Sequence, residues 1–177
     1  MTEATGRHLE DFELGEILMT SRRTITETDL VVYTGLSGDF NPLHTDEVFA
    51  QDTEFGTRIA QGALGLSVAL GLVSQTGLLN GTAVGFLSID HWRFLGPIRP
   101  GDTIQVRAKV TVVRRTSKGD RGVLVRTLDI VNQDGTVVQQ GDIAVLVKCR
   151  YPADPGTHPD GSSTPTEGHS ASPGGDN

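Results

Sequence analysis

The sequence predicts an α+β fold in which a curled antiparallel sheet wraps a long buried helix. Hydrophobic residues cover every face of the helical segment that starts at Gly62 and runs to about residue 76, which is typical of a buried helix. After this segment the hydrophobic period changes to two, which indicates strands. One buried helix followed by consecutive strands favours a sheet that curls around that helix.

The elements that precede this helix are short. Residues 17–25 read as a strand. Thr26, with an acidic residue three positions later, is an N-cap that predicts a helix over 27–36. A glycine, either Gly35 or Gly38, ends that helix.

A loop and then four strands are expected around the long helix. The loop covers 39–44, and Asp46 caps a helical turn that follows it and ends near residue 50. Apolar and polar residues alternate over 104–112, as in a strand with one face on the core and one in water. The predicted strands lie at 83–95, 104–112, 122–131 and 136–148, with a turn at 132–135 between the last two.

The densest group of chemically active side chains lies in the loop. Asp39, Asn41 and His44 place a carboxylate, an amide and an imidazole within six residues. Gly38 and the step from Asn41 to Pro42 break regular structure and force tight turns, so a regular helix is not expected here. A carboxylate and an imidazole held close together can share and activate a water molecule, so the loop predicts an acid–base site.

This loop strongly resembles the hydratase motif of MaoC-like dehydratases and (R)-specific enoyl-CoA hydratases, which have a hotdog fold; it reads SGDFNPLH over residues 37–44. Two further stretches are similar to that family, TRIAQG at 57–62 and FLGPIRPGD at 94–102. The resemblance covers about residues 10–150 in the right order. It implies a single hotdog domain over residues 1–151, with the long helix wrapped by the sheet.

The resemblance implies that Asp39 and His44 are the catalytic pair and that the backbone N–H of Gly62 binds the thioester carbonyl oxygen. The implied reaction is the reversible addition of water to a trans-2-enoyl-CoA, or the dehydration of an (R)-3-hydroxyacyl-CoA. Adding water to C3 puts negative charge on the thioester oxygen, and an N–H at a helix start stabilises that charge. Alone, Asp39 reads as a turn cap and His44 as a partly buried histidine; the motif favours the catalytic interpretation.

The chain departs from the family pattern near the start of the long helix. Members commonly have His where this chain has Gln61, and some have a serine, supporting the catalytic acid, where it has Leu70. Ser67, one turn nearer the helix start, is the candidate substitute, although helical serines often bond their own backbone. Asn41, Gln61 and Ser67 are candidate substrate contacts, and Asn41 is expected chiefly to shape the loop through its own backbone.

A basic cluster raises the question of the carrier. It consists of Arg114, Arg115, Lys118 and Arg121. The cluster is either a solvated hairpin tip or a contact for phosphates, with Arg114 and Arg115 as the candidate substrate contacts. CoA is the family's usual carrier; an acidic acyl-carrier protein, as in polyketide or fatty-acid assembly, is the alternative.

Partners and location follow from composition and the resemblance. The net charge of −7 gives no reason to expect nucleic-acid binding. No transmembrane or secretory segment is visible, and the single Cys149 reads as a buried thiol, so the cytoplasm is favoured, with no membrane partner. The resemblance implies a homodimer, because pairing covers the open edge of a curled sheet.

No cofactor is expected beyond CoA as part of the substrate, because adding water requires no metal or redox group, and no paired Cys/His spacing for zinc is present. The segment 152–177 is rich in Pro, Gly, Ser, Thr and Asp and is expected to be disordered.

Two other functions compete with the hydratase interpretation. A hotdog thioesterase often carries a catalytic Asp or Glu on the central helix, and residues 63–76 contain neither. The other is a non-catalytic hotdog module that binds a thioester or supports a partner subunit, for which the departures at Gln61 and Leu70 leave room.

Overall fold

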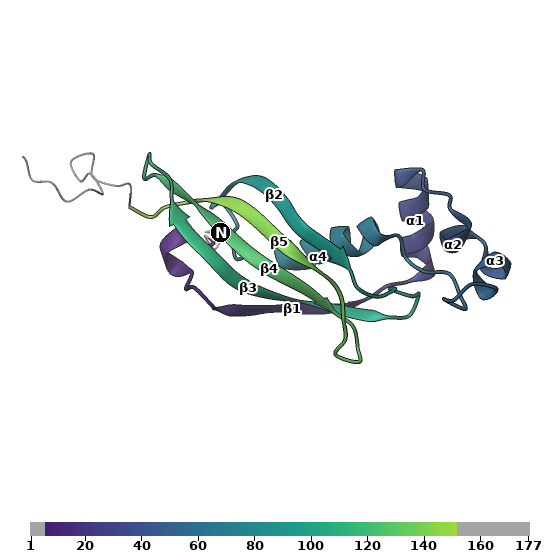
Figure 1. Ribbon diagram of the computed structural model, residues 1–177. Helices are drawn as coiled ribbons and strands as arrows, with labels where there is room; N and C mark the ends of the chain where they lie inside the picture. The colour runs from purple at the N-terminus through teal and green to yellow at the C-terminus, as the bar shows by residue number, and fades with distance from the viewer. Residues whose placement is uncertain (1–5, 152–177) are drawn as a thin grey trace, which may run out of the picture.

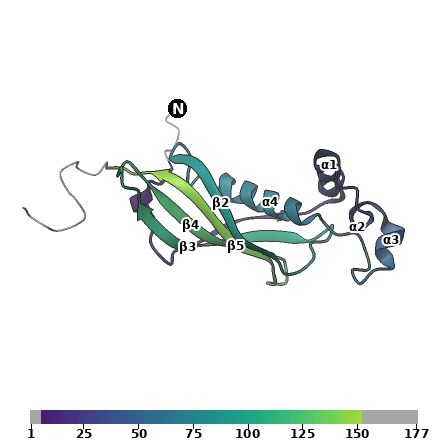
Figure 2. The same cartoon turned by 45° about the horizontal axis from the view of Figure 1, so that its top comes forward.

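The computed structural model describes residues 6–151, in which a long, curved antiparallel sheet carries one helix along its inner side (Figure 1). A cluster of short helices extends beyond one end of that sheet, and Figure 2 shows the same cluster continuing past the start of the long helix. The tail predicted over 152–177 lies outside the described residues.

The elements follow the predicted order. They are the short 3-10 helix η1 (Leu9–Asp11), β1 (Ile17–Thr24), α1 (Glu27–Ser37), α2 (Pro42–Thr45), α3 (Glu47–Gln51), α4 (Gly62–Gln75), β2 (Ala83–Phe94), β3 (Thr103–Arg115), β4 (Arg121–Val131) and β5 (Val137–Lys148). The capping box at Thr26 is confirmed, since its N–H donates to Asp29 Oδ2 at 2.8 Å.

One expectation about the loop is wrong. Residues 42–45 form the helical turn α2 within the stretch 39–44 that is predicted as a loop. Pro42 occupies the first turn of this helix, where its fixed φ is suitable and its missing N–H costs nothing. Asn41 is the N-cap, so the Asn–Pro step starts a helix instead of interrupting one.

The sheet is antiparallel throughout, with the strand order β1-β3-β4-β5-β2. β3, β4 and β5 are consecutive in sequence and adjacent in space, as hairpin connections require. β1 and β2 are the two edge strands of an open sheet. The helix α4 lies between these edges (Figure 1), so the predicted curled sheet around one helix is confirmed.

The core lies between α4 and the inner face of the sheet. Leu64, Val68 and Leu72 of α4 are buried, as are alternate residues of β4 such as Leu124 and Leu128. The expectation that α4 is buried on every side is wrong for a single chain. Its opposite face is exposed at Ala63, Ser67, Gly71 and Ser74, because nothing among residues 6–151 covers that side.

Among residues 6–151, no helix has the length and apolar character needed to span a bilayer. Cys149 is buried, as predicted, and burial raises the pKa of its thiol.

Candidate active site

The end of α1 places the acid of the site. α1 stops at Ser37 because Gly38 adopts the left-handed conformation, with φ 72°, that glycine accepts without strain. The N–H of Gly38 donates to Thr34 O at 2.9 Å, which closes the helix. The chain then turns sharply, and Asp39 follows directly after this C-cap glycine.

Asn41 holds the next turn in place. Its Oδ1 accepts the N–H of Leu43 at 3.0 Å and so caps α2. Its own N–H donates to Asp39 Oδ1 at 3.3 Å, which leaves Asp39 Oδ2 outside this bond. The structure therefore places Asn41 in the support of the loop.

One ring nitrogen of His44 is hydrogen-bonded to the backbone. Its Nδ1 lies 2.8 Å from the carbonyl oxygen of Ile59, and only a protonated Nδ1 can bond to a carbonyl. In the neutral ring, Nε2 then carries the lone pair. That atom lies 3.6 Å from Asp39 Oδ2, in a side chain that is only 12% exposed against 47% for Asp39.

Two acceptors facing each other in this way can share a water molecule. A water has two protons to donate, one to the Asp39 carboxylate and one to Nε2 of the neutral His44, and it keeps a lone pair free to react. The geometry therefore supports the predicted role of these two residues as the holders of a nucleophilic water.

His44 and Gly62 line the same pocket, which has a volume of about 650 Å³. Phe55, Ile59 and Phe94 supply much of its apolar wall, and Gln139 reaches it from β5. A pocket of this size and character accommodates a small organic ligand. The pocket thus brings His44 and Gly62 together from two separate parts of the chain, and Asp39 lies 3.6 Å from His44 within the first of them.

The start of α4 presents unpaired backbone donors. Gly62 is the first residue of α4, and the side chain of the N-cap residue Gln61 makes no capping hydrogen bond. The first N–H groups of a helix have no partner within the helix, and the helix dipole adds partial positive charge there. Gly62 thus offers a donor to an oxygen that becomes negatively charged.

Gln61 does not line this pocket. It is buried, and its Nε2 donates to Thr34 Oγ1 at 2.8 Å, which ties the start of α4 to α1. Gln139, which is not among the residues predicted from the sequence, donates from Nε2 to the carbonyl oxygen of Gly62 at 3.1 Å. Trp92 donates to Gln139 Oε1 at 3.2 Å and fixes that amide, so Gln139 positions the helix start.

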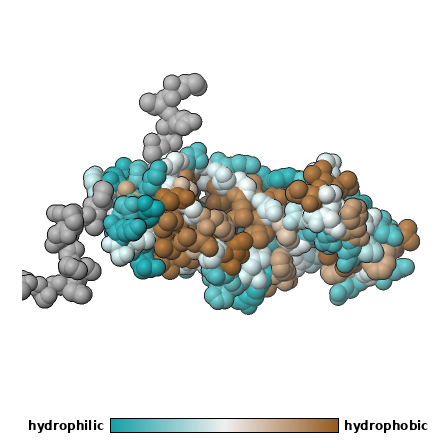
Figure 3. Space-filling view, turned by 90° about the horizontal axis from the view of Figure 1, so that it is seen from above, coloured by the Kyte–Doolittle hydropathy of each residue, from teal (hydrophilic) through white to brown (hydrophobic). Residues whose placement is uncertain are grey.

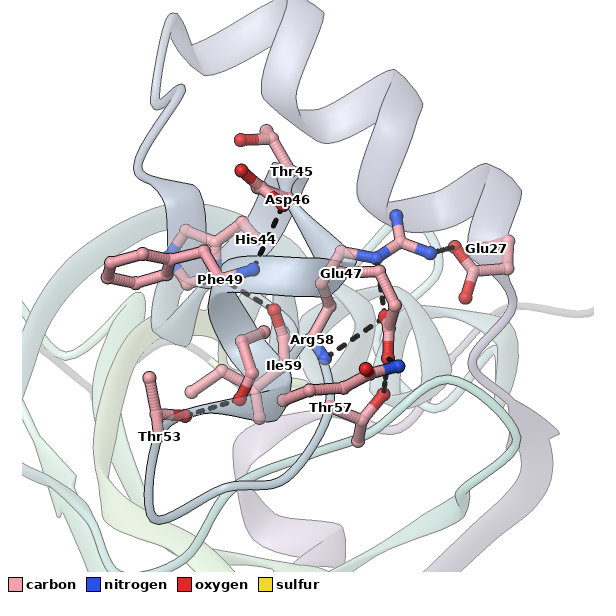
Figure 4. A network of polar contacts seen from close by, with 12 residues as sticks. Glu27, His44, Thr45, Asp46, Glu47, Phe49, Thr53, Thr57, Arg58 and Ile59 are labelled. Carbon is pink, nitrogen blue, oxygen red and sulfur yellow. Dashed lines mark hydrogen bonds and ion pairs between the residues drawn. The ribbon is translucent and has the colours of Figure 1, made fainter.

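An ion-pair network anchors the cluster of short helices to the segment before α4 (Figure 4). Arg58 lies between two carboxylates: its Nε donates to Glu47 of α3 at 2.9 Å, and its terminal nitrogen donates to Glu27 of α1 at 2.8 Å. Thr57 also donates to Glu47, at 3.0 Å. Since His44 bonds to Ile59, the next residue after Arg58, this network also positions the backbone partner of His44.

This network predicts a pH dependence of stability. Hydrogen bonds from Arg58 hold the pKa of Glu47 below its ordinary value of 4.5. A carboxyl whose pKa is depressed in the folded state stabilises the protein above its unfolded pKa and loses that effect as pH falls through the folded value. We expect Glu47→Gln to lower the melting temperature at pH 7, with the difference from wild type shrinking below about pH 4.5.

The matched control is Glu54→Gln, which removes an exposed carboxylate that forms no ion pair within the described residues. Thermal unfolding followed by circular dichroism from pH 7 to pH 3.5 provides the measurement. A melting difference for Glu47→Gln that is the same at every pH would contradict the role assigned to its charge.

The remaining candidate residues lie apart from this pocket. Ser67 is exposed and donates to Ala63 O at 2.8 Å, so its hydroxyl bonds its own helix. Arg114 and Arg115 end β3 at the end of the sheet opposite to α2 (Figure 1). Arg115 donates to the carbonyl oxygens of Gly119 and Tyr151 and pairs with Glu10. Within one chain these residues do not join His44.

A curled antiparallel sheet that carries one long helix along its inner side defines the fold of this chain as a hotdog fold. The chain belongs to the MaoC-like family, whose domain model, described as "MaoC like domain", matches residues 12–132.

Curated and solved relatives agree with this assignment. The chain is 37% identical over 115 residues to Protein MaoC of Klebsiella aerogenes, a match that covers 65% of this chain and 33% of that protein. It is 34% identical over 144 residues to an (R)-specific enoyl-CoA hydratase of Rhodospirillum rubrum, which covers 81% of this chain and 93% of the relative. The crystal structure of the MaoC-like dehydratase from Rhodospirillum rubrum superposes with a TM-score of 0.70 at 26% identity, covering 82% of this chain and 99% of that one.

Proposed function

We propose that this chain is a hydro-lyase that adds water reversibly to a trans-2-enoyl-CoA and, in reverse, dehydrates an (R)-3-hydroxyacyl-CoA. The observation that carries the proposal is the orientation of His44. Its Nδ1 is bonded to Ile59 so that Nε2 faces Asp39, and His44 lines the same pocket as Gly62. The names of the relatives, which include an (R)-specific enoyl-CoA hydratase and a 3-hydroxybutyryl-CoA dehydratase, support the same class of substrate.

The proposed reaction assigns a role to Asp39, His44 and Gly62. Asp39 and His44 orient the water, its oxygen bonds to C3, and Nε2 of His44 accepts a proton. The electrons of the double bond move to the thioester oxygen, where the N–H of Gly62 stabilises the negative charge. When the carbonyl forms again, C2 receives the proton from His44. The steps require no metal or redox cofactor, and CoA enters only as part of the substrate.

The test is the loss of enoyl-thioester absorbance when the wild-type protein is mixed with crotonyl-CoA. We expect hydration to the 3-hydroxy product, identified by chromatography against both enantiomers. Turnover of a carrier-bound enoyl substrate but not of its CoA counterpart would assign the chain to the alternative carrier. Absence of turnover with either would favour a thioester-binding module.

The exposed edge of the sheet supports the proposed homodimer. β2 carries hydrophobic side chains that remain exposed in the single chain, including Phe86 at 52% and Leu87 at 49%. Such an edge has unpaired backbone groups that can pair with another strand. Antiparallel pairing of two β2 strands would place the Ala83 end of one chain beside the Phe94 end of the other, and opposite ends of the two molecules would meet.

We therefore expect light scattering to give about twice the chain mass of 18.9 kDa. Leu87→Lys puts a charge on the β2 edge and is expected to shift the protein toward monomer. Leu14→Lys makes the same change at a residue that is 73% exposed outside the sheet, and it should leave the mass unchanged. A wild-type protein with the mass of one chain would contradict the dimer.

A further inference from the structure

A buried cation lies in the core without a partner among the residues that the structure describes. Arg126 is only 3% exposed, and its backbone pairs with Val110 and Ile143, whose side chains are buried on either side of it. It occupies the inner face of β4, between Leu124 and Leu128. Its Nε is completely buried without a hydrogen-bond partner, and no carboxylate of residues 6–151 forms an ion pair with it.

Arg126 lines an apolar pocket, separate from the His44 pocket, with a volume of about 390 Å³. Leu70 and Val73 of α4 and Val84 and Phe86 of β2 contribute to its apolar wall. Besides Arg126, the polar side chains around it are Ser74 and Asn80, and no acidic residue lines it. Figure 3 shows hydrophobic side chains gathered around a hollow on the face seen from above.

This combination specifies the chemistry of an occupant. A guanidinium stays protonated even when it is buried, and a buried charge is costly unless it is paired. Its planar donors match the two oxygens of a carboxylate. The apolar wall suits a hydrocarbon chain, so a molecule that fits the whole pocket has an apolar body and ends in a carboxylate.

The position of the pocket connects it to the proposed reaction. Along α4, Leu70 lies about 12 Å from Gly62 at 1.5 Å per residue, which is far for a short acyl group in the same chain. In the proposed dimer, however, antiparallel β2 pairing would place the Ala83 end of one chain beside the Phe94 end of the other chain. Ala83 lines the Arg126 pocket and Phe94 lines the His44 pocket, so the Arg126 pocket of one chain would lie near the His44 pocket of the other. An acyl group bound at one chain's His44 would then extend toward Arg126 of its partner.

We propose that Arg126 binds the free carboxylate at the far end of the substrate's acyl group, which makes thioesters of dicarboxylic acids the preferred substrates. This inference rests on the proposed function and on the proposed dimer. It assigns to Arg126 a role in specificity, separate from the chemistry at Asp39 and His44.

The first test measures binding and does not depend on turnover. Saturated CoA thioesters of dicarboxylic acids with four to ten carbons are compared by calorimetry with the monocarboxylic thioesters of the same length. We expect at least one length at which the terminal carboxylate tightens binding to the wild type by about 10- to 100-fold, as a charged hydrogen-bonded pair predicts. Arg126→Met should abolish that preference and leave the affinity for the monocarboxylic thioester within about twofold.

Arg126→Met keeps the volume of the side chain and removes a buried charge, so we expect it to fold with an unchanged or raised melting temperature. Arg126→Lys, which keeps the charge without the planar fork, should retain part of the preference. In kinetics with the corresponding trans-2-enoyl thioesters, Arg126→Met should lower kcat/KM only for the substrates that end in a carboxylate.

The two proposals fail in different ways. Hydration of neutral enoyl thioesters without a preference for the carboxylate at any length would overturn the role of Arg126 and leave the hydratase proposal standing. Binding that depends on Arg126, without turnover of any thioester, would overturn the hydratase proposal and leave the carboxylate-binding role of Arg126 standing. Binding of free adipate without a preference among thioesters would identify a separate effector site and overturn the substrate assignment.

Discussion

Asp39→Asn and His44→Ala are each expected to lower kcat/KM for enoyl-CoA hydration by about 10²- to 10⁴-fold, the range typical of a positioned acid–base group. The amide introduced by Asp39→Asn would keep the shape of the carboxylate but would have neither its charge nor both its acceptor atoms. Removal of the imidazole leaves no base 3.6 Å from Asp39 Oδ2. The measurement is the initial rate of loss of enoyl absorbance with crotonyl-CoA.

The two residues are expected to act as one unit. Because both are assigned to the same water, the variant that lacks both should be about as slow as the slower single variant, and their effects should not multiply. Additive losses would show that the two side chains act in separate steps. Activity within tenfold of the wild type in either single variant would contradict the proposed mechanism.

A matched control lies two residues after His44. Asp46 accepts the N–H of Phe49 at 3.0 Å and caps α3. Asp46→Asn removes one negative charge near the site but keeps a good N-cap, so it should change kcat/KM by less than about threefold. Asp39→Asn should likewise fold normally, since an amide oxygen at position 39 can still accept the N–H of Asn41. Thermal unfolding of each variant checks this.

Most elements could be predicted because their signals are local. The capping box at Thr26 and the left-handed Gly38 define α1, and the period of two defines the strands. The loop was the exception, since a proline that usually interrupts a helix can also begin one. The exposed face of α4 could not be predicted either: a helix that is apolar on every side indicates burial, while within residues 6–151 one sheet covers one side of α4.

The site residues also divide into those that a local motif predicts and those that only the packed structure reveals. Asp39 and His44 lie close together in sequence, so one motif contains both. Gln139 could not be found in this way, because it meets Gly62 only through the register of β5 and the position of α4. Arg126 sits in a strand where apolar residues occur on both faces, so alternation does not reveal which side it occupies. Only the packed structure shows that this charge points into the core.

Gly62→Ala is expected to lower kcat by about 10²-fold or more, the cost of weakening one oxyanion donor. A Cβ at this position would lie 2.7 Å from Cε1 of Phe94 in the pocket shared with His44. The backbone N–H survives the substitution, but the methyl group would keep the thioester oxygen from approaching it. Because that contact matters most as charge develops in the transition state, kcat should fall more than KM rises.

Two further variants separate this effect from simple crowding. Gly71→Ala changes the same helix where an added Cβ has nothing within 4 Å, and it should leave activity unchanged. Phe94→Ala removes the ring that the new methyl would displace. If displacement of that ring causes the loss, the variant with both Gly62→Ala and Phe94→Ala should match Phe94→Ala alone. If the methyl blocks the thioester oxygen, as we expect, the double variant should remain as slow as Gly62→Ala. A kcat for Gly62→Ala within twofold of the wild type would contradict the role of Gly62 in the mechanism.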